Sequence, residues 1–456
     1  MRPQTVLAAL AAVTLLAAGC GRSGSAGQEE EETKAATTSS ADFGDLKNVC
    51  GPGKPTSAPT QGVTADEIKL GVFSDIGFTK NPEFVDTAKV FTTWCNEQGG
   101  INGRKLVATT RDSKLLEVRQ RMLESCREDF AIVGGGSALD ATGVNDRLSC
   151  LMPAFPGQVS MAGNVGSDLQ VAAFGGASYS PYTGYHRWLL KEKYPDSAKS
   201  VGLISGDSPI TKIINGQTKE GLIAAGGTIT YEDLYPAQGV ADWTPYAQSL
   251  KSKGVKGLVF LGSFDGLAKL EQVLTGIGYK LDWIDANSNA YGPAFLQLAA
   301  NSVASQNNYA DLSGVYPLEK ADDNPATKQL VDLFAKNAPD AHVTLPAVRG
   351  FAAWLLFAKS AKACGDDLTR KCVYENALKE KKWTGGGLTA PADLSNQDGP
   401  QKCFNIEKAT SKGWEPADFA PDTGAYRCDS STYKFKGAYP KPVTLADVGK
   451  SMNDVK

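Results

Sequence analysis

Between residues 62 and 112 the spacing of the apolar residues changes clearly from that of a β-strand to that of an α-helix and back. Residues 68–73 form a short apolar run that ends in turn-forming residues at 74–77, as expected for a β-strand that leads into a loop. Beyond Pro82 the apolar residues recur at helical spacing until a Gly-Gly pair at 99–100 ends the helix, and a second strand follows. This stretch is predicted to be a right-handed β–α–β unit with two parallel strands.

The same alternation continues through two later regions. Residues 115–155 are predicted to add two helices and two strands, and residues 201–284 to form four strands and three helices. Because strands alternate with helices in both regions, the predicted fold class is α/β, with two doubly wound sheets rather than one large sheet. Two strongly apolar helices are expected at 326–336 and 346–363.

The carboxyl ends of the predicted strands hold the first candidate site residues. Ligands of open parallel sheets bind beyond those ends, which singles out Ser74, Asp75 and Phe78 after the first strand. The third strand is followed by three glycines and Ser137, where backbone N–H groups are able to approach a ligand closely.

The first residues of the chain are expected to lie outside the fold. Residues 6–18 are apolar except for Thr14, a run too short to span a bilayer but typical of a signal-peptide core. The run ends in Leu-Ala-Ala-Gly before Cys20, which resembles the lipobox of bacterial lipoproteins, where the cysteine receives a diacylglyceryl group. Residues 1–19 are therefore predicted to be a lipoprotein signal peptide and Cys20 to be lipidated. An ordinary cleavage site with an incidental cysteine is the alternative.

Residues 20–62 are expected to be a flexible tether, because they are rich in Gly, Ser, Thr, Ala and Pro and hold almost no large apolar side chain. Four glutamates at 29–32 are expected to be solvated. No later segment offers the run of about eighteen apolar residues that a membrane-spanning helix requires. The remaining body of roughly 390 residues favours two domains over one ordinary core.

Charge and motifs exclude some classes of function. With 47 basic and 50 acidic residues, the chain lacks the basic surface of a nucleic-acid-binding protein. His186 and His342 are isolated, and neither HExxH nor GxSxG occurs. No enzyme, metal site or cofactor is therefore predicted.

The cysteines favour disulfides. Nine are present, and setting Cys20 aside leaves eight, an even number in a chain predicted to be exported. Spacing alone leaves 105 connectivities open for eight cysteines. The preferred pairs are the local ones, Cys364 with Cys372 and Cys403 with Cys428, then Cys126 with Cys150, and last Cys50 with Cys95.

Several phrases resemble the leucine/isoleucine/valine-binding family of type I periplasmic binding proteins. The most specific is Gly-Gly-Ile-Asn-Gly-Arg-Lys at 99–105, and Gly-Val-Thr-Ala-Asp-Glu-Ile-Lys-Leu-Gly at 62–71 supports it. The resemblance covers about residues 62–400. It implies two Rossmann-like lobes, joined by a three-strand hinge, that close over a small ligand. Further supporting matches lie at 132–134, 225–227, 242–246 and 351–359.

The resemblance also implies the extent of each lobe. Crossings between the lobes are expected near Gly176, residues 315–317 and residues 387–389. The expected lobe 1 comprises residues 63–176 and 318–388, and the expected lobe 2 comprises residues 177–317 and 389–445.

The first-lobe ligand contacts of the family are only partly matched. Ser137, with Ala138 beside it, takes the place of a serine that binds the carboxylate of an amino acid. The corresponding threonine is absent, unless Gln158 or Ser160 substitutes for it.

The second-lobe contacts differ more. Phe264 corresponds to an aromatic residue of the family, and Asn287 to the acid that holds the ammonium group, although Asp285 serves with a shift. An unpaired ammonium group in a closed cleft is costly. The expected ligand classes therefore include, in addition to amino acids, amides and other small molecules that are neutral or have their charges arranged differently. Tyr179, Tyr182 and Tyr291 are further candidates for flat apolar contacts.

Proteins of this family deliver their ligand to an ABC permease with a cytoplasmic ATPase. The resemblance and Cys20 together predict a monomeric solute-binding protein, lipid-anchored at the extracytoplasmic face of the bacterial cytoplasmic membrane. The lipid anchor is its only expected contact with that membrane. A ligand-sensing receptor ectodomain of the same fold is the alternative.

Overall fold

The computed structural model describes residues 41–173, 175–236 and 238–456. The predicted signal peptide, the predicted lipidation site Cys20 and the acidic run at 29–32 lie outside the described residues. All described residues belong to one compact unit, 39–456. Within the described part of the chain, no helix is both long enough and apolar enough to cross a bilayer.

The predicted β–α–β unit is present at the start of this fold. β1 (Glu67–Ser74) and β2 (Lys105–Asp112) pair in parallel along their whole length, and α2 (Glu83–Glu97) connects them. β3 (Ala131–Val133) and β4 (Ala154–Phe155) extend the parallel sheet in the order β2-β1-β3-β4.

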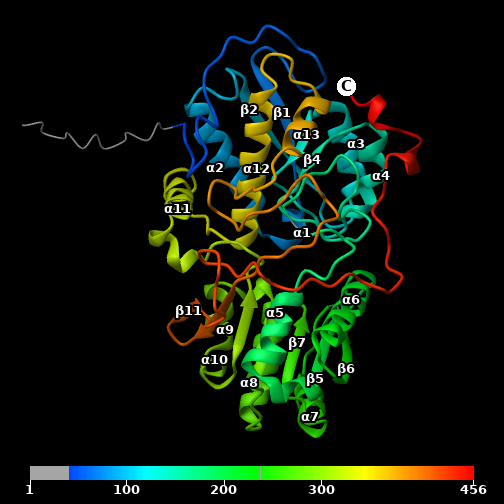
Figure 1. The fold of residues 1–456 in the computed structure, drawn as a ribbon, viewed down its shortest axis with the longest axis vertical. Coiled ribbons are helices and arrows are strands. Elements are labelled where there is room, and N and C mark those ends of the chain that lie inside the picture. The colour runs from blue at the N-terminus through cyan, green and yellow to red at the C-terminus, as the bar shows by residue number, and fades with distance from the viewer. Residues whose placement is uncertain (1–40, 174, 237) are drawn as a thin grey trace, which may run out of the picture. The chain divides into compact units, whose positions relative to one another are not determined.

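Helices from distant parts of the sequence cover this first sheet. α12 (Leu345–Ala363) packs against α2, β3 and β4, and Figure 1 shows it lying across the sheet beside α2. This position explains its apolar composition, since Trp354 stacks on Phe91 of α2 with ring centroids 5.3 Å apart. The other helices of this region are α3 (Val118–Glu128), α4 (Val144–Ser149), α11 (Pro325–Asn337), α13 (Arg370–Ala377) and a 3-10 helix at Asp140–Gly143.

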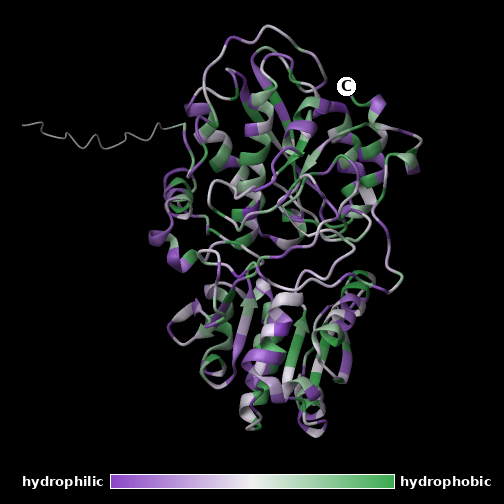
Figure 2. Cartoon of the chain, viewed as in Figure 1, coloured by the Kyte–Doolittle hydropathy of each residue, from purple (hydrophilic) through white to green (hydrophobic). Residues whose placement is uncertain are grey.

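The second sheet is larger than the sequence pattern indicates. Strands β5 to β9 run parallel, β10 pairs antiparallel with β9, and β11 pairs antiparallel with β10, in the order β11-β10-β9-β8-β7-β5-β6. The four predicted strands are present, whereas β9, β10 and β11 are additional. Figure 2 shows hydrophobic residues along β5 and β7, inside this sheet. The strand bounds are β5 (Val201–Asp207), β6 (Ile229–Pro236), β7 (Gly257–Leu261), β8 (Trp283–Asp285), β9 (Asn308–Asp311), β10 (Ile406–Thr410) and β11 (Gly413–Pro416).

The helix that matters most for the site, α6 (Pro209–Ala225), begins at a capping box. The Ser208 hydroxyl accepts the N–H of Thr211 at 3.2 Å, and the Thr211 hydroxyl accepts the N–H of Ser208 at 3.0 Å. The other helices of this region are α5 (Thr183–Arg187), α7 (Thr244–Ser252), α8 (Phe264–Gly276), α9 (Pro293–Ala299) and α10 (Asn301–Ser305). Shorter helical turns occupy Trp188–Lys193, Pro195–Lys199, Ser288–Ala290, Leu318–Asp323, Ala446–Val448 and Met452–Asp454.

The segments that connect the two sheets pair with one another. Val315 and Thr389 form an antiparallel bridge, and Gly176 donates its N–H to the carbonyl of Gly399 at 2.8 Å. We call the first sheet with its helices lobe 1 and the second sheet with its helices lobe 2. The predicted fold class, two Rossmann-like lobes joined by a hinge, is confirmed.

The prediction of a flexible tether over residues 20–62 is wrong for about its second half. In residues 41–62, Phe43 is fully buried with its ring 4.9 Å from that of Phe351. Cys50 is bonded to Cys95 on α2. Few apolar side chains are enough to order this segment, because each one fills a buried position and the disulfide restrains the chain between them.

The C-terminal segment leaves lobe 2 before the predicted end of that lobe at residue 445. Leu445 and Val455 pack against Leu148 and Leu169 of lobe 1. Figure 1 shows the segment passing between the lobes and continuing along α4 to the C-terminus. The sequence gives little sign of this return, because the two apolar anchors stand apart in a polar stretch.

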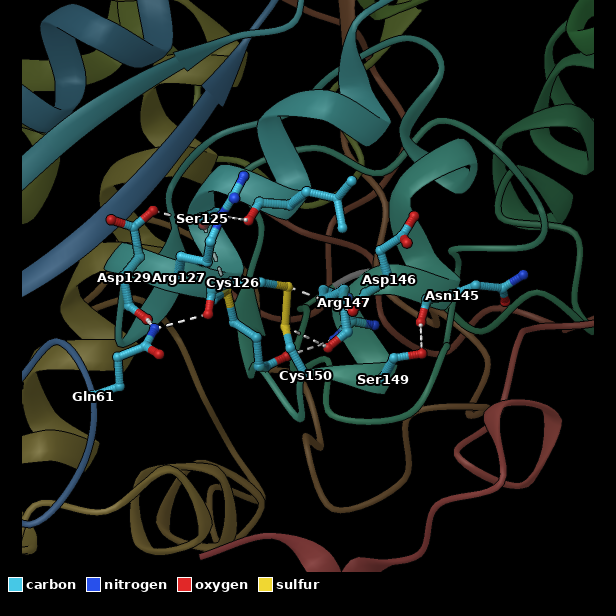
Figure 3. Close-up of a disulfide and its surroundings, with 12 residues drawn as sticks. Gln61, Ser125, Cys126, Arg127, Asp129, Asn145, Asp146, Arg147, Ser149 and Cys150 are labelled. Atoms are coloured by element: carbon cyan, nitrogen blue, oxygen red, sulfur yellow. Dashed lines mark hydrogen bonds between the residues drawn. A yellow bond between two sulfur atoms is a disulfide. The ribbon is translucent and has the colours of Figure 1, made fainter.

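Among the described residues, four disulfides stabilise the fold, and they are the four preferred pairs. One of them joins Cys126 on α3 to Cys150 just after α4, as Figure 3 shows. In the same view the Gln61 side chain donates to the carbonyl of Cys126 at 2.9 Å, which fixes the N-terminal segment to α3. The other bonds are Cys50–Cys95, Cys364–Cys372 and Cys403–Cys428.

Candidate functional site

Asp75, directly after β1, ties three loops of lobe 1 together. Its carboxylate accepts the backbone N–H of Ala138 at 2.7 Å and that of Leu115 at 2.9 Å. The hydroxyl of Ser113 also donates to it, and the hydroxyl of Ser137 lies 3.2 Å from both carboxylate oxygens. Asp75 therefore holds the loops after β1, β2 and β3 in place through hydrogen bonds.

This cluster contains most of the predicted first-lobe site residues. Ser74, Asp75, Ser137 and Ala138 come together here, but none of them lines either of the two cavities described below. Phe78, on the short helix α1 (Ile76–Thr79), is 61 % exposed and also lies outside both. Contact between these residues and a ligand stays a prediction.

Asp285 and Asn287 form a polar group within lobe 2. Asp285, at the end of β8, lies 3.2 Å from Nε2 of His186 and accepts the N–H of Asn287 at 3.0 Å. The Asn287 side chain donates to a backbone carbonyl of β7 at 3.0 Å. Neither residue lines either of the two cavities. In the resembled family an acidic residue holds the ammonium group of the ligand, and neither cavity wall has a counterpart at these two positions.

A cavity of about 450 Å³ lies between the lobes, and we call it the cleft cavity. Four predicted ligand-binding residues line it: Gln158, Ser160, Tyr179 and Tyr182. Burial raises the pKa of Tyr182 to about 12, so its hydroxyl keeps its proton at neutral pH. A volume of this size is typical of small-molecule sites.

Tyr291 and Phe264, the other two aromatic residues predicted to contact the ligand from lobe 2, lie elsewhere in that lobe. The Tyr291 hydroxyl donates to Glu319, and burial together with that carboxylate raises the pKa of Tyr291. Phe264 packs against the main hydrophobic core. Neither residue lines the cleft cavity.

One face of α6 forms the lobe 2 wall of the cleft cavity. Ile210, Ile213, Ile214 and Gln217 line it, at the spacing i, i+3, i+4 and i+7 that places side chains on one side of a helix. The sequence predicts a helix here but not its role, because an apolar stripe of this kind usually packs into a core.

The facing wall is a loop of lobe 1 that Asp140 holds in place. The carboxylate accepts the backbone N–H of Ser160 at 2.7 Å and of Met161 at 3.0 Å, and the side-chain amide of Asn164 at 3.0 Å. Burial raises the pKa of Asp140 to about 6, although these hydrogen bonds oppose the shift. Met161 and Val165 line the cavity from this loop.

Arg349, on α12, is the one charged side chain in the described lining of the cleft cavity. Burial lowers the pKa of its guanidinium, while Tyr182 and Asp311 oppose that shift. Burial raises the pKa of Asp311 to about 7. The sequence predictions missed Arg349, although an arginine in the apolar first half of this helix was an available signal, since arginine is rarely buried.

A second cavity of about 510 Å³ lies against the connecting segments, and we call it the hinge cavity. Lys381, Lys382 and Lys402 contribute to its wall, and Arg349 is common to both cavities. Among the residues that the structure describes, no group of three or more His, Cys, Asp or Glu side chains is arranged to hold a metal ion.

Solved structures share this architecture. A fatty acid ABC transporter substrate-binding protein from Thermomonospora curvata is 20% identical, with a TM-score of 0.64 over 82% of this chain and 94% of that chain. The branched-chain amino acid transporter substrate-binding protein LivJ from Streptococcus pneumoniae, in complex with isoleucine, is 17% identical, with a TM-score of 0.63 over 77% and 98%. A possible leucine/isoleucine/valine-binding protein from Rhodopirellula baltica is 12% identical, with a TM-score of 0.64 over 80% and 99%. At these identities the likeness establishes the fold.

The sequence itself establishes the family. A search of curated proteins finds no match. In contrast, the family model described as periplasmic binding protein matches residues 68–413, well over half of the chain. The match covers the first sheet, the second sheet up to the start of β11, and most of the residues that line the cleft cavity. The chain therefore belongs to the periplasmic binding proteins, a family of solute-binding proteins.

Proposed function

We propose that this protein captures a small organic molecule in the cleft cavity by closure of its two lobes. The main support for this proposal is that both lobes contribute to the cavity wall. Lobe 2 contributes α6, and lobe 1 contributes Arg349 and residues within 158–166. A ligand that contacts both walls stabilises the closed arrangement relative to an open one, which is a shift of populations.

We also propose that the bound molecule passes to an ABC permease with a cytoplasmic ATPase. A lipidated Cys20 holds the protein, as a monomer, at the extracytoplasmic face of the cytoplasmic membrane, because two acyl chains are enough for stable anchoring. The family match and the structural neighbours described as ABC transporter proteins support this role.

The neighbours and the predicted residues define which ligands to test. The neighbours are described as proteins for fatty acids and for branched-chain amino acids. The proposed contacts are the predicted residues that line the cavity, namely Gln158, Ser160, Tyr179 and Tyr182. Amino acids, amides, aliphatic and aromatic acids and sugars are therefore the classes to compare.

A thermal-shift screen of these classes on the compact unit 39–456 tests the proposal. At least one class is expected to raise the melting temperature, because a ligand that binds only the folded state stabilises it. No shift with any class contradicts capture of a small molecule. Deletion that abolishes uptake of the identified compound supports transport, whereas unimpaired uptake favours the receptor-ectodomain alternative.

The anchoring step has its own test. Metabolic labelling with palmitate is expected to mark the wild-type chain and not the Cys20→Ser variant. Labelling that survives the substitution contradicts lipidation at Cys20.

A further inference from the structure

The charge of the cleft cavity is that of an anion site. No Asp or Glu lines it among the described residues, and Arg349 is its one charged group. Asp311, which does not line the cavity, interacts electrostatically with Arg349, and burial raises the pKa of its carboxyl group. A cationic ligand group would meet no carboxylate partner in this wall.

The remaining lining is largely apolar. Ile210, Ile213 and Ile214 face the cavity from α6, and Met161 and Val165 face it from lobe 1. Contact with these side chains favours a hydrocarbon group over a polar one, because apolar surface is removed from water on binding.

The groups that would hold an α-amino acid are engaged elsewhere. The Ser137 hydroxyl bonds to Asp75, and Asn287 bonds within lobe 2 to a backbone carbonyl. Asp285 lies against His186. The cavity therefore offers one cation and a hydrocarbon-like wall without a site for an ammonium group.

We propose that the ligand of the cleft cavity is an apolar monocarboxylate, whose carboxylate pairs with Arg349 and whose hydrocarbon part lies along α6. This inference rests on the proposed function and specifies the ligand class of the same site. Arginine suits this role because its planar guanidinium matches a carboxylate in geometry and charge.

Calorimetric titration of the unit 39–456 with octanoate, octanamide, octylamine and leucine tests the ligand class. Octanoate is expected to bind at least tenfold more tightly than the other three compounds. In Arg349→Gln the octanoate affinity is expected to fall about tenfold or more, to the level of octanamide, because a charge-assisted hydrogen bond is lost. Octanamide affinity itself is expected to be unchanged in this variant.

Control variants separate charge pairing from folding and from the hinge cavity. Arg119→Gln removes a guanidinium whose side chain is 71% exposed and is expected to leave octanoate binding unchanged. Arg349→Lys keeps the charge and is expected to bind octanoate with intermediate affinity. Ile213→Asn is expected to weaken octanoate binding, whereas Lys382→Gln in the hinge cavity is not.

Several results would overturn this ligand class. One such result is tighter binding of leucine or octylamine than of octanoate. A second is an equal loss of affinity for octanoate and octanamide in Arg349→Gln. A third is a loss of octanoate affinity in Lys382→Gln alone. Binding of another class in the screen without octanoate binding overturns the ligand class but leaves solute capture intact. Binding of no class overturns both.

A separate observation concerns residues 429–456, which we call the C-terminal strap. Its first anchor is Glu220 on α6, in lobe 2. That carboxylate accepts the N–H of Lys436 at 2.6 Å and of Gly437 at 3.2 Å, and the hydroxyls of Tyr433 at 3.1 Å and Tyr439 at 2.8 Å.

The second anchor of the strap is on lobe 1. The N–H of Val443 donates to the carbonyl of Gly163 at 2.9 Å. The N–H of Leu445 donates to the carboxylate of Asp168 at 2.6 Å, and the Leu445 side chain is buried among apolar residues of α4. The strap is therefore held on both sides of the cleft.

Between its anchors the strap lies over the cleft cavity. Phe435 and Pro440 are part of the cavity lining. The chain from Gly437 to Val443 spans at most about 20 Å when fully extended, which sets an upper limit on how far the two anchors move apart.

We infer that the C-terminal strap restrains the opening of the lobes. Lobe separation beyond that limit requires one anchor to detach, and such detachment also uncovers the cavity between Phe435 and Pro440. Full opening thus costs the hydrogen bonds of one anchor in addition to the hinge motion.

A protease site inserted between Pro440 and Lys441 tests the restraint in the folded protein. Cleavage is expected to increase the radius of gyration in small-angle scattering and to speed amide exchange in residues 158–166 and 209–217 on both cavity walls. The same site inserted between Ser411 and Lys412, in the exposed turn between β10 and β11, is the matched control and is expected to change neither. Glu220→Ala, which frees one anchor without cleavage, is expected to act as the cut does.

The inference is overturned if complete cleavage after Pro440 leaves both measurements unchanged. It is also overturned if cleavage in the control turn changes them equally, since that result would indicate a general loosening of lobe 2.

Discussion

At the scale of single residues, buried polar groups decide which loops stay in place. Asp75 and Asp140 each gather donors from separate parts of lobe 1, and only the second of them shapes the cleft cavity. The sequence predicts Ser137 correctly as a residue at the end of a strand. The sequence does not reveal that the Ser137 hydroxyl bonds to Asp75, because the tertiary structure brings these two residues together.

Asp75→Ala is expected to lower the free energy of unfolding by about 2–3 kcal/mol, because several donors to one buried carboxylate lose their acceptor together. Ser137→Ala removes one of these donors and is expected to cost about 1 kcal/mol or less. Chemical denaturation of both variants measures the difference. A Ser137→Ala variant with normal stability that no longer binds octanoate would instead return Ser137 to the ligand site.

Glu271, buried in α8, is expected to make stability depend on pH. Burial raises its pKa to about 8, and the side-chain amide of Asn308 donates to it at 3.0 Å. Because the folded state holds its proton more tightly than the unfolded state, this contribution to stability is full below about pH 4 and is lost as pH rises through about 8.

Glu271→Gln is expected to remove that dependence and to raise the melting temperature at pH 8, since a neutral amide keeps the Asn308 contact. Melting curves between pH 5 and pH 8 check this. A fall in the variant as steep as in the wild type would mean that Glu271 is not the group responsible.

At the scale of elements, alternation predicts strands β1 to β8 and the long helices well and fails for β9, β10 and β11. β10 reads Ile-Glu-Lys-Ala-Thr, with Glu407 1% exposed, so a charged residue occupies a core position and hides the strand. The apolar stripe on α6 can be recognised in the sequence, but the residues that face it cannot. The sequence therefore does not distinguish a helix face that lines a cleft from one that packs into a core.

The disulfides act on elements by closing loops of different length. Their separations are 45 residues for Cys50–Cys95, 24 for Cys126–Cys150 and 8 for Cys364–Cys372. Replacing both cysteines of a pair by serine is expected to cost about 4, 3.5 and 2.5 kcal/mol in that order, if loop entropy dominates. Chemical denaturation of the three double variants tests the ranking, and a larger loss for the shortest loop would contradict it.

At the scale of the whole molecule, two lobes share the lining of one cavity, and ligand capture by closure depends on this arrangement. The sequence resemblance predicts the family, the lobes and the hinge, since these follow from motifs and repeated alternation. It cannot place Arg349, Phe435 or Pro440 in the cavity, because they reach it from α12 and from the C-terminal strap, far from the predicted strand ends.

The most direct test of the central claim is small-angle X-ray scattering of the unit 39–456, titrated with the compound that gives the largest thermal shift. Closure of the lobes predicts that the radius of gyration falls as the compound binds and reaches a plateau at the same concentration as the calorimetric titration. Saturated binding without any decrease in the radius of gyration would contradict capture by closure of the two lobes.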